Sequence, residues 1–105
     1  LSAFPHPLMR NRYLLCYDIR DPVRLRRTAK VAEMWGTRIE YSVFICDLDV
    51  VERARLERAL RDVLHQTVDR AFLVDLGPAG PASRKRFRWL TPPVEFPDPK
   101  VATIL

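Results

Sequence analysis

Hydrophobic positions are densest between residues 13 and 19, where the only charged side chain is Asp18. Alternation along a strand puts one set of side chains on a common face: Tyr13, Leu15, Tyr17 and Ile19. The opposite face receives Leu14, Cys16 and Asp18. Because neither set is polar, we predict a strand that is buried on both sides. Two helices can cover one side in a domain of this size, so we expect a second copy of the chain to cover the other, with Asp18 near the subunit boundary.

The segment after this strand has the pattern of an amphipathic helix. Asp21 is a good N-cap and Pro22 suits the first helical position. The helix should run to about Trp35, and Gly36 should end it. We predict the core-facing stripe to be Leu25, Ala29, Ala32 and Trp35.

A second helix is predicted after Asp49, which forms a capping-box pattern with Glu52. It should end near His65. Its apolar stripe is Leu56, Ala59, Leu60, Val63 and Leu64. Its solvated face carries charges at steps of four residues, which favours weak ion pairs: Arg53, Glu57 and Arg61.

The remaining strand candidates are less regular. Residues 37–48 alternate as a strand without a Gly, Pro or Asn hairpin signal, so they form either one long bent strand or two strands that break near Tyr41 and Ser42. Residues 71–76 are predicted to form a strand. Residues 77–82 should act as a hinge, and residues 84–90 could form a short strand with Phe87 and Trp89 as apolar anchors.

The order of strand, helix, strand or strand pair, helix, strand predicts an α+β, ferredoxin-like split β-α-β fold. One antiparallel sheet would carry both helices on one face and form a homodimer through the other. We assign residues 9–90 to this domain. Residues 1–8 are expected to be a disordered extension or cloning remnant, and residues 91–105 a Pro-rich extended tail lying over another surface.

The charge of the chain points to a polyanionic partner. The net charge is +5, and fifteen of the eighteen basic residues are Arg, which grips phosphate through paired N–H donors. The basic excess lies in residues 10–40 and 84–88. No apolar run approaches the roughly 20 residues of a membrane helix and no secretory signal is present, so we expect a cytoplasmic protein without membrane contact.

Few side chains are suited to catalysis. There is no Gly-rich phosphate loop, no Ser-His-Asp set and no C-x-x-C motif, and His6 and His65 are isolated. Cys16 and Cys46 are predicted to be reduced core thiols. This leaves Asp18. A lone Asp at a strand end is most often a turn or cap residue, but two copies facing across a two-fold axis could hold Mg²⁺ or Mn²⁺.

Four motifs in order resemble one family. They are Y-D-I at residues 17–19, D-P-x-R-L-R-R at 21–27, G-x-R-I-x-Y-S-V-F at 36–44 and D-L-G-P-A at 75–79. The series resembles the second CRISPR-associated protein family, Cas-two, over about residues 9–89. Thr28 stands where this helix often carries an aliphatic residue.

The resemblance implies a ferredoxin-like homodimer whose C-terminal segment reaches the other subunit. It implies that Asp18, paired with its copy, is the metal-binding and catalytic residue, with supporting roles for Tyr17, Ser42 and Phe44. The resemblance and the Arg-rich first helix together indicate nucleic-acid contacts at Arg24, Arg26, Arg27 and Arg38.

Three functions are compatible with this reading. The favoured one is an adaptor that binds double-stranded DNA with the Cas-one integrase during spacer acquisition, because the basic surface suits phosphate contacts without base reading. The second is a Mg²⁺-dependent endonuclease of RNA or double-stranded DNA with weak or conditional activity. The third is a related toxin-type ribonuclease.

Overall fold

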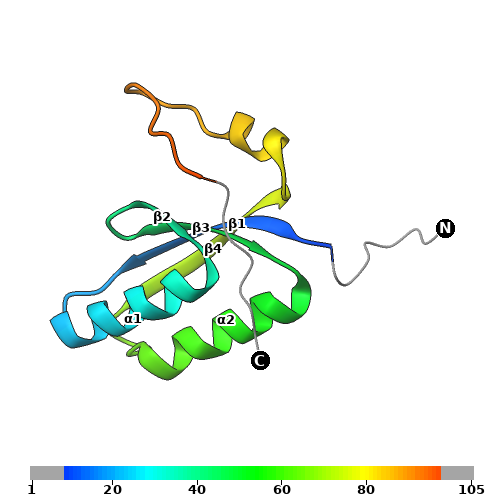
Figure 1. Cartoon of the computed structure of the whole chain (residues 1–105). Coiled ribbons are helices and arrows are strands. Elements are labelled where there is room, and N and C mark those ends of the chain that lie inside the picture. The colour runs from blue at the N-terminus through cyan, green and yellow to red at the C-terminus, as the bar shows by residue number, and fades with distance from the viewer. Residues whose placement is uncertain (1–8, 98–105) are drawn as a thin grey trace.

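The computed structural model describes residues 9–97, so the predicted extension at residues 1–8 and the end of the Pro-rich tail lie outside the described residues. The elements follow in the order β1 (Asn11–Asp18), α1 (Pro22–Trp35), β2 (Thr37–Glu40), β3 (Val43–Leu48), α2 (Val50–Val63), β4 (Arg70–Pro78) and the 3₁₀-helix η1 (Pro81–Arg86). The four strands form one antiparallel sheet in the order β2-β3-β1-β4. Both helices lie on one face of this sheet (Figure 1). The predicted ferredoxin-like α+β fold is therefore confirmed.

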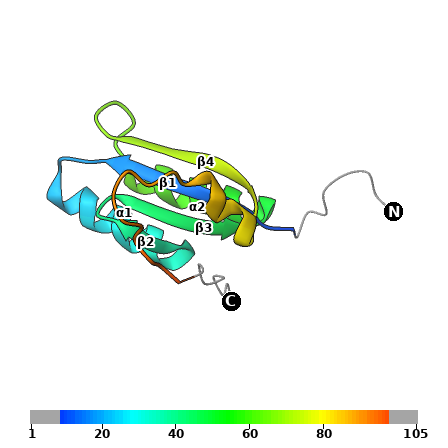
Figure 2. The ribbon, with the colours of Figure 1, turned by 90° about the horizontal axis from the view of Figure 1, so that it is seen from above.

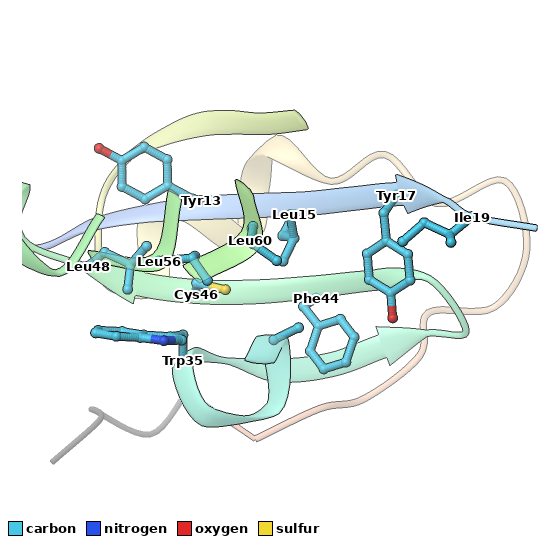
Figure 3. Packing of buried hydrophobic residues seen from close by; sticks show 11 residues of the cluster. Tyr13, Leu15, Tyr17, Ile19, Trp35, Phe44, Cys46, Leu48, Leu56 and Leu60 are labelled. Atoms are coloured by element: carbon cyan, nitrogen blue, oxygen red, sulfur yellow. The ribbon is translucent and has the colours of Figure 1, made fainter. Parts of the chain in front are cut away.

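The core lies between the sheet and the two helices. The predicted inward face of β1 is confirmed, since Tyr13, Leu15 and Tyr17 are buried. They pack with side chains of β3 and both helices, among them Phe44, Cys46, Trp35, Leu56 and Leu60 (Figure 3). Neither of the two described helices has the length and apolar character needed to cross a bilayer.

The start of α1 agrees with the sequence prediction, and its buried stripe agrees at Leu25, Ala32 and Trp35 but not at position 29. The Asp21 carboxylate accepts a hydrogen bond from the Arg24 amide at 2.9 Å, and Pro22 occupies the first turn. Thr28 is fully buried whereas Ala29 is only half-buried. The stripe thus includes position 28, because it lies one helical turn before Ala32 and shares its face.

Gly36 ends α1 for a reason other than the predicted one. Its φ of −161° is extended backbone that any residue adopts, so no left-handed cap is formed. A Cβ atom here would lie 2.5 Å from both the Cys46 Sγ atom and the Ile45 carbonyl oxygen. Glycine is therefore needed because β3 approaches the backbone closely.

The capping box of α2 is confirmed in both directions. The Glu52 amide donates to the Asp49 carboxylate at 2.8 Å, and the Asp49 amide donates to Glu52 at 2.9 Å. Arg10 adds a further bond to the Glu52 carboxylate at 3.0 Å. The predicted ion pairs along the exposed face are also present, between Glu57 and its neighbours Arg53 and Arg61.

Residues 37–48 form two strands joined at Tyr41 and Ser42, so the second of the two alternatives is correct. The described chain has no residue other than glycine at positive φ. The turn therefore avoids the left-handed conformations that favour Gly and Asn, which explains why the sequence carries no hairpin signal. A register shift between Arg38 and Glu40 accompanies it.

Two predictions about the C-terminal region need correction. The break predicted over residues 77–82 is confined to Ala79 and Gly80, because β4 continues through Gly77 and Pro78, and residues 84–90 form no strand. Instead Pro81 opens η1, and Phe87 and Trp89 stack on each other at 6.0 Å while Phe96 packs on Phe87 at 6.1 Å. A strand needs a neighbouring strand for its backbone groups, and the described part of a single chain places none beside this segment.

A buried ion pair fixes η1 to the sheet. The Arg12 guanidinium, which is 2% exposed, donates to both carboxylate oxygens of Asp47 at 2.7 and 2.9 Å. It also donates to the Ser83 hydroxyl at 2.9 Å. Arg12 and Asp47 are cross-strand partners on the sheet face opposite the helices. Their pairing places η1 and the following segment on that side of the sheet (Figures 1 and 2).

A second ion pair holds the beginning of α1 against the loop before β4. Arg24 donates to both carboxylate oxygens of Asp69 at 2.7 and 3.1 Å, and the His65 amide adds a bond at 2.8 Å. The Asp69 side chain is 1% exposed. The hydrogen bond from Arg24 lowers the pKa of Asp69, and the bond from His65 acts in the same direction.

We expect Arg12→Met to lower the free energy of unfolding by about 3–5 kcal/mol, because it leaves the Asp47 carboxylate buried without its partner. Urea unfolding at fixed protein concentration measures the loss. The double variant Arg12→Met/Asp47→Leu should lose less. Arg61→Met, at a side chain 67% exposed, is the control and should cost under about 1 kcal/mol. Equal losses for Arg12→Met and Arg61→Met would contradict this assignment.

Asp69 should contribute to the loss of stability in acid. Because its folded-state pKa is lowered, its contribution is present at neutral pH and is lost as the pH falls below about 4 and the carboxylate is protonated. In Asp69→Asn, the free energy of unfolding should be lower at neutral pH and should decline less between about pH 5 and pH 2. Arg24→Met should show the same shallower decline. A decline as steep as that of the wild type in both variants would refute the assignment.

Candidate functional site

Asp18 lies at an accessible end of the central strand. It is the last residue of β1 and is exposed. Because Tyr17 and Ile19 are buried on the helix side, the Asp18 carboxylate is on the opposite side of the sheet. The Tyr17 amide donates to the Ser42 carbonyl oxygen at 3.2 Å. Ser42, a predicted supporting residue, thus fixes the end of β1 through its backbone.

The position predicted to bind a metal has few ligands in a single chain. Among residues 9–97, no group of three or more His, Cys, Asp or Glu side chains is close enough to hold a metal ion. The Asp18 carboxylate has the oxygen donors that Mg²⁺ and Mn²⁺ prefer. The donor chemistry therefore fits such an ion, and the number of donors fits only if a second copy supplies another carboxylate.

The two cysteines offer no nucleophile. Neither forms a disulfide, and Cys46 is buried whereas Cys16 is half-buried. Burial raises the pKa of the Cys46 thiol to about 12 and also raises the pKa of Cys16. The prediction of a reduced core thiol is confirmed for Cys46, whereas Cys16 is a half-buried thiol outside the core cluster.

Three predicted site residues form a row beside the end of β1. The Tyr17 ring stacks on Phe44 at a centroid distance of 6.2 Å (Figure 3). The Arg38 guanidinium lies over two aromatic rings, 4.9 Å from the centroid of Phe44 and 5.8 Å from the centroid of Tyr41. Phe44 therefore positions both Tyr17 and Arg38. A guanidinium held over a ring keeps its in-plane N–H donors available for an anion.

Arg38 also lines a basic cavity between α1 and the β2–β3 turn, which we call the α1–β2 cavity. Its volume is about 320 Å³, and its lining residues are Tyr17, Leu25, Arg26, Ala29, Lys30, Glu33, Arg38 and Tyr41. Within residues 9–97, Arg26, Lys30 and Arg38 form no ion pair with an acid. The Tyr17 hydroxyl is buried and has no hydrogen-bond partner in this part of the chain. Three cations that have no acidic partner in the described part of the chain thus line one cavity.

The four arginines predicted to bind nucleic acid have different environments. Arg26 and Arg38 meet in the α1–β2 cavity, and Arg27 is exposed on α1. Arg24 is engaged by Asp69, and the hydrogen bond that it donates to that carboxylate raises the pKa of Arg24. We therefore regard Arg24 as a residue that positions α1.

Sequence reasoning missed two basic residues near these sites. Lys30 lies one helical turn after Arg26, so the spacing along α1 could have indicated it. Arg70 is the cross-strand partner of Asp18 on β4, although 52 positions separate the two residues in the sequence. Only the register of the strands brings them together.

The sequence matches a family model over most of the described domain. The model of the family described as CRISPR associated protein Cas2 matches residues 10–80. A relative from Geobacter sulfurreducens named CRISPR-associated endoribonuclease Cas2 is 35% identical over 71 residues, covering 68% of this chain and 75% of the relative. A relative from Synechocystis sp., named CRISPR-associated endoribonuclease Cas2 2, is 43% identical over 54 residues, or 51% of this chain and 50% of the relative.

The fold is also similar to that of a solved Cas2 structure. The crystal structure of Cas2 from Streptococcus pyogenes superposes with a TM-score of 0.65 at 25% sequence identity, covering 76% of this chain and 99% of that one. The matched residues include β1 with Asp18, both helices and the whole four-stranded sheet. The sequence match and the shared architecture lead to one conclusion: the chain belongs to the CRISPR-associated Cas2 family.

Proposed function

We propose that this chain is a CRISPR adaptation protein that binds double-stranded DNA as a homodimeric adaptor for the Cas1 integrase during spacer acquisition. The observation that carries the proposal is the α1–β2 cavity, where Arg26, Lys30 and Arg38 have no acidic partner among the described residues. Basic side chains of this kind bind the phosphate backbone, because their contacts with the phosphates release the counterions that were condensed on the DNA.

The position of these cations favours backbone contact over base reading. Arg26 and Lys30 project from one face of α1, and Arg38 comes from the edge strand β2. Tyr41, the exposed aromatic beside them, is already engaged by the Arg38 guanidinium. Contacts to phosphates position a protein on a duplex without specifying a sequence. This suits an adaptor that must hold DNA segments of many sequences.

The homodimer would form through the sheet face that the helices leave uncovered, which we call the open face. Its central side chains are Leu14, Cys16, Val43, Ile45, Phe72 and Val74. Phe72 is 58% exposed and Val74 is 40% exposed. Exposed apolar side chains that adjoin a buried apolar band favour burial against another protein surface. A second copy of the same face would cover them and bring the two Asp18 residues toward a common axis.

A metal-dependent endonuclease acting on RNA or double-stranded DNA is the second candidate. It is favoured by the exposed carboxylate of Asp18 and by relatives named endoribonucleases. The Asp18 residues of both copies would hold Mg²⁺ or Mn²⁺, which polarises a phosphodiester and lowers the pKa of a bound water. Tyr17, Phe44 and Arg38 would support the substrate beside this site.

The triple variant Arg26→Ala/Lys30→Ala/Arg38→Ala should weaken binding to a short DNA duplex and reduce its salt dependence. Each lost phosphate contact lowers the slope of log K against log salt by about 0.9, so the slope should fall by roughly 2–3. Fluorescence anisotropy over a range of salt concentrations measures both quantities.

The matched control removes three arginines from α2 as Arg55→Ala/Arg58→Ala/Arg61→Ala. All three are exposed and lie on the other helix. This control should keep most of the affinity and slope. If both triple variants lose affinity and slope equally, binding depends on net charge alone and the assignment of the cavity is wrong.

A further inference from the structure

The strongest unassigned feature is the basic residue directly across the sheet from Asp18. Arg70 begins β4 and is the cross-strand partner of Asp18. Tyr17 is buried on the helix side and Ala71 packs against the same core. Asp18 and Arg70 therefore both project on the open face, where directly opposed Cβ atoms lie about 4.5–5.5 Å apart.

Strand pairing places Arg70 as the residue opposite the Asp18 carboxylate. Strand β3 begins at Val43, which pairs with Cys16, so Asp18 extends past the end of β3 and has a cross-strand partner on β4 alone. Both side chains are exposed, and within residues 9–97 neither forms an ion pair in this structure. The guanidinium and the carboxylate are thus adjacent, accessible and free to bind other ions.

The start of β4 is also held in place. Asp69, immediately before Arg70, is fixed by both hydrogen bonds from Arg24 and by the His65 amide. On the other strand, the Tyr17 amide is bonded to Ser42. The backbones that carry Asp18 and Arg70 are therefore anchored on both sides, so the two groups stay opposite each other.

We propose that Arg70 makes the binding of a divalent cation at Asp18 depend on the binding of a phosphate group. This rests on the proposed function, because the phosphate is that of a bound nucleic acid. Without nucleic acid, the positive charge of Arg70 offsets Asp18 and repels a cation. A phosphate oxygen pairs with Arg70 and adds negative charge, so the cation then binds between two anions.

Two consequences follow from linkage. If a phosphate raises the affinity for the cation, the cation raises the affinity for the nucleic acid by the same factor. The metal site would be assembled only on nucleic acid, and free Mg²⁺ would bind poorly. In a homodimer the same argument applies twice, since two aspartates and two arginines would bring no net charge to the shared site.

The test measures Mn²⁺ binding by electron paramagnetic resonance, with and without a short DNA duplex, after subtracting Mn²⁺ bound by the duplex alone. The wild type should bind Mn²⁺ weakly alone and several-fold more tightly with the duplex. Arg70→Gln should bind Mn²⁺ about fivefold or more tightly than the wild type without DNA, because one repelling charge is gone. It should gain little further affinity when the duplex is added.

Two other variants serve as controls. Arg55→Gln removes the same charge from an exposed position on α2, on the other side of the sheet from Asp18, and it should behave as the wild type. Asp18→Asn should abolish the protein-dependent Mn²⁺ signal under both conditions while leaving duplex binding largely intact. Arg70→Gln should also lower the salt slope of duplex binding by about 0.9, the value for one phosphate contact.

The proposal is overturned if Arg70→Gln leaves the Mn²⁺ affinity unchanged without DNA, if the duplex still enhances binding as in the wild type, or if the wild type binds no Mn²⁺ under either condition. In each case the α1–β2 cavity variants still report separately on DNA binding. If the wild type instead fails to bind the duplex at all, the proposed adaptor function fails, and the claimed coupling fails with it. A higher Mn²⁺ affinity of Arg70→Gln without DNA would then show only that Arg70 repels a cation.

Discussion

The constraint on which this structure depends is that β1 is apolar on both faces while the two helices cover only one. On the helix side, the core buries Tyr13, Leu15 and Tyr17. On the open face, the cross-strand pairs change character from one end to the other. Arg12 and Asp47 form a buried ion pair under η1 at one end, apolar side chains occupy the middle, and Asp18 lies opposite Arg70 at the other end.

The three parts of the open face have different consequences for the structure. The buried ion pair orders the C-terminal segment on the open side of the sheet, where Figure 2 shows it crossing the strands. The apolar middle provides a surface for a partner, since Phe72 and Val74 remain exposed. At the charged end, Asp18 and Arg70 are exposed. A single uncovered face can therefore account for the expected dimer, the shared aspartates and the position of the C-terminal segment.

The sequence was most informative where the signals are local. The N-cap at Asp21, the capping box at Asp49 and the alternation along β1 each depend on residues within a few positions of one another, and the structure has all three. The same is true of the motifs that led to the Cas2 family, whose model covers residues 10–80.

What the sequence could not provide depends on register and on close approach. Arg70 lies opposite Asp18, and Arg12 pairs with Asp47, only because the strands pair in a particular register. The requirement for glycine at position 36 arises from its contact with β3. The predicted strand at residues 84–90 is absent because such a strand requires a neighbour, and none of residues 9–97 forms one beside this segment.

The most direct test of the central claim is the mass of the protein in dilute solution by sedimentation equilibrium. The open face should be buried against a second copy, so the wild type should sediment as a dimer. Phe72→Asp/Val74→Asp should sediment as a folded monomer. The control Val50→Asp/Val51→Asp, at two valines 49% and 47% exposed on α2, should remain a dimer. A wild type that is monomeric at all concentrations, with a mass unchanged in the open-face variant, would contradict the account.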